Sequence, residues 1–192
     1  MTQALTRMQW LSPAFPVGAF AYSHGLEQAI ADGTVSDAAT LGAWLRALLE
    51  HGSGRADAVI LAAAYGQEDP ADVDATARAF AAGAERLKET DLQGAAFCDT
   101  ARAGWGIEIA GLTYPVAVAA AARAMGISLA DTLPLYLQAF ASNLVSAAQR
   151  ALPLGQTDGQ AVLAALGPVI EKTAQEAANT PIGALSSASF AA

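Results

Sequence analysis

The sequence predicts an all-α fold, a single-domain bundle of about eight helices over residues 1–192. Apolar residues recur at helical spacing along most of the chain. No segment shows the alternation of apolar and polar residues, bounded by turn residues, that is typical of a strand. A chain of 192 residues also has the length of one domain and can bury a complete core.

The first half of the chain predicts two consecutive helices. Apolar residues from Leu41 to Leu48 repeat at helical spacing, and Asp37 before them is a residue type that favours a helix start. A second helix covers residues 58–65. We expect it to end at Gly66, because glycine tolerates the left-handed turn that often follows a helix.

Two more helices are predicted in the middle of the chain. The first begins at Asp69-Pro70, where a capping side chain precedes a proline in the first turn, and it continues through Phe80. The second covers residues 85–103. The side chains expected to face inward on this helix are Leu92, Ala95 and Ala96.

The last third of the chain predicts three helices. One covers 115–125 and ends at Gly126, and the next covers 131–150. The third begins at residues 157–160, whose Thr-Asp-Gly-Gln pattern matches a capping box. We expect this helix to bend or break before Pro168, because proline lacks an amide hydrogen and clashes with the preceding turn.

The composition limits the classes of partner. Charged residues make up only 15% of the chain and hydrophobic residues 54%, so either small residues cover much of the surface or a partner covers an apolar patch. The net charge of −8 argues against binding to nucleic acid or to an anionic membrane. The longest apolar stretch, 109–122, contains Pro115 and is too short to span a bilayer. The absence of an apolar leader and of paired cysteines favours a cytoplasmic protein.

The stretch SPAFPVGAFAYSHGLE, residues 12–27, is the most unusual part of the sequence. If a helix begins near Gly18, one stripe of its side chains faces inward and an adjacent stripe lies beside it. The inward stripe would hold Tyr22, Leu26 and Ile30, and the adjacent stripe Phe20, His24 and Glu27. A bland interpretation, with Phe20 in the core and Glu27 a solvated acid, stays open beside that of a rigid docking surface.

Catalysis and metal binding find little support in the sequence. His24 and His51 are the two histidines, and neighbouring Ser23 and His24 would point apart on a helix, which disfavours a hydrolase. Such an enzyme would also need a third catalytic partner, and the sequence does not reveal one. His24 and Glu27 are three residues apart and would share a helix face, but they are only two metal ligands. Cys98 is expected to be a buried, inert thiol.

A second dense stretch, RALPLGQTDGQ, covers residues 150–160. Ser142, Ser146 and Arg150 recur every four residues on one helix face, which places the guanidinium beside the carbonyls that are free at the helix end. Arg150 could also pair with Asp158 and fix the loop between the two helices.

These two stretches identify a family resemblance. SPAFPVGAFAYSHGLE resembles the N-terminal signature of the UreF family, the urease accessory proteins F, and YLQAFASNLVSAAQRALPLGQTDGQAVLAAL (136–166) resembles its second signature. TYPVAVAAAARAMGI and ERLKETDLQG fit the family more loosely. The resemblance covers about residues 11–170.

The resemblance implies a single all-helical, dimeric, non-enzymatic domain without a cofactor, which acts as a cytoplasmic chaperone of nickel insertion into apo-urease. Its partners would be the D-type accessory protein (called H in some organisms) and the G-type GTPase that carries nickel. Glu27 and the 150–160 loop would face the GTPase, and Arg150 could act as an arginine finger, although a loop-fixing Arg150 is favoured. The partner-binding residues implied are Phe20, Tyr22, His24, Glu27, Arg150, Gln156, Asp158 and Gln160.

Two further expectations follow. The alternative function is a nickel-binding metallochaperone that uses His24, Glu27 and His51. The family's tail carries a His-Glu pair and a basic-aromatic finish that docks to the D-type partner, whereas this chain ends GALSSASFAA, with only Phe190 similar to that pattern. We expect the small and polar residues 179–192 to form a flexible tail.

Overall fold

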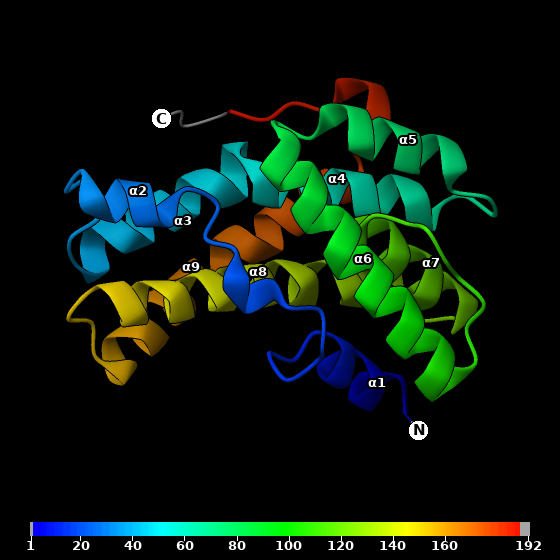
Figure 1. The fold of residues 1–192 in the computed structure, drawn as a ribbon, viewed down its shortest axis with the longest axis horizontal. Coiled ribbons are helices and arrows are strands. Elements are labelled where there is room, and N and C mark those ends of the chain that lie inside the picture. The colour runs from blue at the N-terminus through cyan, green and yellow to red at the C-terminus, as the bar shows by residue number, and fades with distance from the viewer. Residues whose placement is uncertain (1, 189–192) are drawn as a thin grey trace.

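The computed structural model describes residues 2–188, and this part of the chain is all-α, as predicted, with no strand in it. Figure 1 shows α1 and η2 on opposite sides of the molecule, with α6 crossing in front of α7 and α8. The elements are α1 (Gln3–Trp10), η1 (Ala19–Ala21), α2 (Leu26–Ala31), α3 (Ala38–His51), α4 (Ser53–Tyr65), α5 (Ala71–Phe80), α6 (Ala84–Trp105), α7 (Tyr114–Ala124), α8 (Leu129–Ala151), α9 (Gln156–Ala178) and η2 (Ile182–Ala184).

The centre of the bundle is formed by α4 and α7, which pack closely against each other. Residues 58–61 of α4 are consecutive and all buried, and so are residues 115–119 of α7, so both helices are enclosed on several sides. The small alanine side chains of α7 allow this enclosure. Part of the high apolar content of the chain therefore lies inside the protein rather than on its surface.

Several predicted helix starts and ends are confirmed. At one of them, Gly66, the backbone conformation differs from the predicted one. Asp37 caps α3 through a reciprocal capping box with Thr40, whose backbone amide donates to the Asp37 carboxylate at 2.9 Å. Gly126 follows α7, as expected, and its φ of +64° is left-handed. Gly66 does follow α4, but its φ of −72° is right-handed, so the conformational freedom of glycine is not needed there.

The predicted start of the last helix and its predicted break before Pro168 are both wrong, whereas a bend there stays a prediction. The N-cap of α9 is Gly155, without a side-chain hydrogen bond, so Thr157 lies inside the first turn and forms no capping box. The helix also continues through Pro168 to Ala178. Burial of residues on both sides of the proline, such as Leu166 and Ile170, offsets its cost of about 3 kcal/mol.

The predicted inward face of α6 is also wrong. The Leu92 side chain is 52% exposed and Ala95 is exposed, whereas Gln93 and Phe97 face the core. The buried face of α6 begins with polar residues, Glu89 and Thr90, because Glu89 contacts His24 and Thr90 accepts a hydrogen bond from the Tyr114 amide of α7. A pattern that counts only apolar residues cannot identify such a face.

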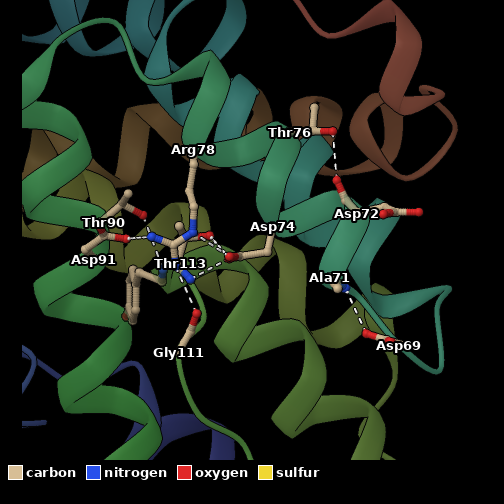
Figure 2. A network of polar contacts seen from close by, with 11 residues as sticks. Asp69, Ala71, Asp72, Asp74, Thr76, Arg78, Thr90, Asp91, Gly111 and Thr113 are labelled. Carbon is tan, nitrogen blue, oxygen red and sulfur yellow. Dashed lines mark hydrogen bonds and ion pairs between the residues drawn. The ribbon is translucent and has the colours of Figure 1, made fainter.

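The segment between α6 and α7 is fixed by a buried aspartate of α5. The carboxylate of Asp74 accepts hydrogen bonds from the Thr113 amide (2.7 Å) and hydroxyl (2.8 Å), and it pairs with Arg78 Nε at 2.7 Å. Figure 2 shows the Arg78 guanidinium between Asp74 and Asp91, where it also donates to the carbonyl of Gly111 at 2.9 Å. This network joins α5, α6 and the approach to α7.

Residues 182–188 follow α9 and run beside α4. Ile182 and Leu185 pack against the core, and the Ala188 amide donates to the carbonyl of His51 at 2.6 Å. The flexibility expected of residues 179–192 stays a prediction, and Phe190 lies outside the described residues.

We predict that Gly94→Ala destabilises the protein. A Cβ at residue 94 would lie 2.0 Å from the carbonyl oxygen of Leu112 and 2.8 Å from the carbonyl carbon of Thr113, so the segment before α7 would have to move. Urea denaturation should show a loss of about 3 kcal/mol or more in the free energy of unfolding.

The matched control is Gly104→Ala, in the last turn of the same helix, where a Cβ meets no atom within 4 Å. It should raise the free energy of unfolding by up to about 1 kcal/mol, because alanine favours helix. Equal effects of the two substitutions would contradict the close approach at Gly94.

Candidate protein-docking site

The SPAF…GLE stretch does not form the predicted continuous helix. After the short turn η1, Tyr22 is extended, His24 and Gly25 adopt left-handed φ values of +52° and +85°, and α2 begins at Leu26. His24 therefore precedes the helix, and it does not share a helix face with Glu27 as predicted. Leu26 is buried as expected, whereas Phe20 is 73% exposed, which excludes the interpretation that Phe20 belongs to the core.

The imidazole of His24 points into the protein. Its side chain is only 10% exposed, with Nε2 lying 3.2 Å from Oε1 of Glu89 on α6 and Nδ1 lying 3.2 Å from Oγ of Ser53 on α4. The ring also meets Phe140 of α8 edge-on, with 4.8 Å between the ring centroids. His24 is thus a buried contact of this stretch rather than a residue that an incoming partner can reach.

A chain of buried charges continues from His24 across the bundle. Arg86 Nη1 pairs with Oε2 of Glu89 at 3.0 Å, and Arg86 Nη2 donates to both carboxylate oxygens of Asp57 at 2.7 and 2.6 Å. The hydroxyl of Tyr136 completes the chain by donating to Asp57 at 3.0 Å. One cation therefore serves two buried carboxylates that belong to α4 and α6.

The same network shifts the pKa values of its members. Burial alone would raise the pKa of Glu89, but the hydrogen bond from His24 and the charges of His24 and Arg86 outweigh it, so this pKa lies below 4.5. Burial and the charge of Asp57 raise the pKa of Tyr136 well above 10. Glu89 is therefore ionised at neutral pH, and Tyr136 keeps the proton that it donates.

Ser53, His24 and Glu89 contact one another in the order nucleophile, base and acid that a hydrolase uses. Glu89 would be the third catalytic partner, which the sequence did not reveal. The cavity lined by His24, Glu89 and Tyr136 has a volume of about 30 Å³. It has room for a water molecule, but Ser53 is not among the residues that line it, so it offers no substrate site beside the Ser53 hydroxyl. The geometry supports a structural contact more than a hydrolase.

The two dense stretches of the sequence meet at Arg150. Its Nη1 donates to the carbonyl of Ser146 at 3.1 Å, which confirms the predicted position beside the helix-end carbonyls. Its Nη2 donates to the carbonyl of Phe20 at 3.1 Å, a contact between residues 130 positions apart in the chain. The predicted pair of Arg150 with Asp158 is not among the ion pairs of residues 2–188, because the guanidinium is turned toward η1.

The other predicted site residues differ in their exposure. Tyr22 is half-buried and lines the cavity beside His24. Glu27 is exposed on α2. The first turns of α9 carry three more exposed predicted residues, Gln156, Asp158 and Gln160.

The predicted nickel site of His24, Glu27 and His51 is not formed. Within residues 2–188, no three His, Cys, Asp or Glu side chains are close enough together to hold a metal ion. His24 contacts Glu89 instead of Glu27, and His51 is exposed at the end of α3. Cys98 is buried as expected, and burial raises its pKa.

Sequence reasoning missed the polar network that His24 joins. Ser53, Asp57, Arg86 and Glu89 lie on two helices outside both dense stretches. One signal was available: Arg86 and Glu89 are three residues apart, which is the spacing of an ion pair on a helix. Nothing in the sequence indicated that this pair faces inward.

Sequence comparisons with known proteins identify relatives of this chain. The sequence model of the UreF family matches residues 35–167. The chain is 54% identical over 189 residues to a urease accessory protein UreF of Roseobacter denitrificans, covering 97% of this chain and 85% of the relative. It is 53% identical to that of Cereibacter sphaeroides (97% and 89% covered) and 45% identical to that of Ruegeria pomeroyi (98% and 88% covered).

The chain belongs to the UreF family of urease accessory proteins. Membership in this family implies a role in urease maturation. Across the described residues, no helix is both long enough and apolar enough to cross a lipid bilayer.

We predict that Arg86→Met destabilises the protein by about 3–5 kcal/mol, because it leaves the carboxylates of Asp57 and Glu89 buried without their cation. Urea denaturation at pH 7 measures the loss. Arg46→Met, at an exposed position of α3, is the control and should change the free energy of unfolding by less than about 0.5 kcal/mol. Similar losses for both variants would show that the network contributes little.

The lowered pKa of Glu89 predicts a pH dependence. A carboxyl group with a lower pKa in the folded state contributes stability above its unfolded pKa of about 4.5, and this contribution is lost as the pH falls through the folded pKa. In urea denaturation between pH 7 and pH 3, wild type should have a higher free energy of unfolding than Glu89→Gln at pH 7. This difference should shrink as the solution becomes acidic. An advantage that stays constant would contradict the ionised, paired state of Glu89.

Proposed function

We propose that this protein is a non-enzymatic scaffold and regulator of urease maturation. It links the nickel-carrying G-type accessory GTPase to the D/H-type accessory protein for nickel insertion into apo-urease. It works in the cytoplasm, as a homodimer, and without a cofactor of its own. The name shared by its relatives, urease accessory protein, supports the maturation role.

One observation carries the docking part of this proposal: the contact of Arg150 with the carbonyl of Phe20 brings the two dense stretches together. The docking surface that we propose consists of the exposed residues Phe20, Glu27, Arg150, Gln156, Asp158 and Gln160. Phe20 is the large apolar side chain on this surface, and an exposed aromatic residue on a fixed backbone is typical of an interface hot spot.

The contacts of Arg150 favour a loop-fixing role over an arginine finger. Its Nη1 donates a hydrogen bond to the carbonyl of Ser146, and its Nη2 donates to the carbonyl of Phe20. An arginine finger must release such contacts before it can reach a nucleotide. Arg150 therefore shapes the surface that the GTPase meets.

We predict that Phe20→Ala lowers the affinity for the partner proteins by about tenfold or more, because truncation of an aromatic hot spot costs about 2 kcal/mol or more.

Arg150→Ala and Asp158→Ala should impair urease activation more than they lower the melting temperature. Glu27→Ala should leave the fold intact. Leu92→Ala is the control for Phe20→Ala, because Leu92 is a large exposed apolar residue on α6, outside the proposed surface.

The measurements are size-exclusion chromatography with light scattering of this protein with the D/H-type protein and the GTPase, and urease activity and nickel content in cells that carry each variant. A wild-type protein that binds neither partner would contradict the proposal. Parallel losses of activation and melting temperature for Arg150→Ala would support a structural role of the loop instead.

A further inference from the structure

We propose that Glu89 of α6 is a positioning residue for the docking surface, and that it acts by holding His24 and thereby the segment of residues 18–27. This inference rests on the proposed function, because that segment carries Phe20 and Glu27. Glu89 lies outside both dense stretches of the sequence, and it cannot touch a partner itself because its side chain is only 6% exposed.

The segment of residues 18–27 has little structure of its own. The amides of Ala21 and Tyr22 donate to the carbonyls of Gly18 and Ala19, and the Leu26 amide donates to that of Ser23 at 2.9 Å. These are single turns that exchange readily with open conformations in a free chain. Contacts with other helices must therefore select the observed path.

His24 needs such a contact more than its neighbours do. Its φ of +52° is left-handed, which costs energy for any residue with a Cβ, and within residues 2–188 His24 is the one non-glycine residue with a positive φ. The contacts of its ring with Glu89, Ser53 and Phe140 compensate for this cost. Without them the chain would relax toward a right-handed or extended backbone at residue 24.

Glu89 can act as a fixed point because its own position is determined by several partners. Oε2 pairs with Arg86, and Oε1 accepts a hydrogen bond from Gln93 Nε2 at 3.0 Å in addition to its contact with His24. Arg86, Glu89 and Gln93 all lie on α6, a single long helix. The His24 side chain is therefore attached to the rigid core of the protein, while the backbone around it belongs to the surface.

Two polar contacts therefore hold the segment, together with the buried side chain of Leu26. Arg150 of α8 holds the carbonyl of Phe20, and Glu89 holds the side chain of His24 four residues later. Loss of the second contact would loosen the backbone between Phe20 and the buried Leu26, and a partner would have to order it again upon binding. The expected consequence is a lower affinity without any change in the surface residues themselves.

The test compares Glu89→Ala, His24→Asn and the double variant with wild type. Asparagine tolerates the left-handed backbone, but its short side chain cannot reach Glu89, and this variant leaves the pairing of Glu89 with Arg86 in place. His24→Asn therefore tests the inference by itself if Glu89→Ala does not fold. Tyr136→Phe is the control, because it removes the hydrogen bond to Asp57 at the far end of the same network.

The first readout is hydrogen exchange at the amides of Tyr22 and Leu26. Each single variant should accelerate exchange by about tenfold or more, and the double variant should add nothing, because both substitutions break one contact. Tyr136→Phe should leave these amides unchanged. Unchanged exchange in folded Glu89→Ala, or additive effects in the double variant, would overturn the inference.

The second readout is the affinity for the D/H-type protein and for the GTPase, which should fall by about tenfold in Glu89→Ala and His24→Asn, in proportion to the faster exchange. If Phe20→Ala weakens binding and Glu89→Ala does not, the positioning role is wrong and the proposed function stands. If Phe20→Ala has no effect on binding either, the proposed docking surface is wrong, and the positioning role is overturned with it.

Discussion

The arrangement of this protein depends on one largely buried guanidinium. Arg86 lies between Asp57 of α4 and Glu89 of α6, and through these carboxylates it is connected to Tyr136 of α8 and to His24 before α2. Two buried carboxylates without a cation would be strongly unfavourable in a core built mostly from alanine, leucine and valine. The network therefore fixes how these helices face one another, which apolar packing alone specifies less strictly.

The buried network also explains how the irregular segment of the proposed docking surface keeps its conformation. Two residues of the proposed docking surface, Phe20 and Glu27, lie on a short turn and a short helix joined by an extended residue, and none of these is stable alone. This segment keeps its shape because its inward side chain, His24, reaches the charged network and because Arg150 holds the Phe20 carbonyl. An irregular segment held by a rigid scaffold is a common arrangement at binding sites.

Most of the helices could be predicted from sequence, because apolar spacing and capping residues are local signals. The helix start at Asp37 and the helix end at Gly126 were predicted in this way. The inward face of α6 could not be found, because its polar residues are buried only in the presence of partners on α4 and α7. Likewise, a proline such as Pro168 breaks a helix by local rules, but tertiary packing on both sides keeps α9 continuous.

The sequence by itself determined the helical class and the family, because periodicity and two long motifs are properties of the chain alone. Only the tertiary structure decided what the motifs do: it turned His24 inward, left Phe20 exposed and brought Arg150 to a carbonyl 130 residues earlier. The physical reason is that these contacts join residues far apart in sequence. Their energies depend on burial and on partners from other helices, and neither is encoded in local spacing.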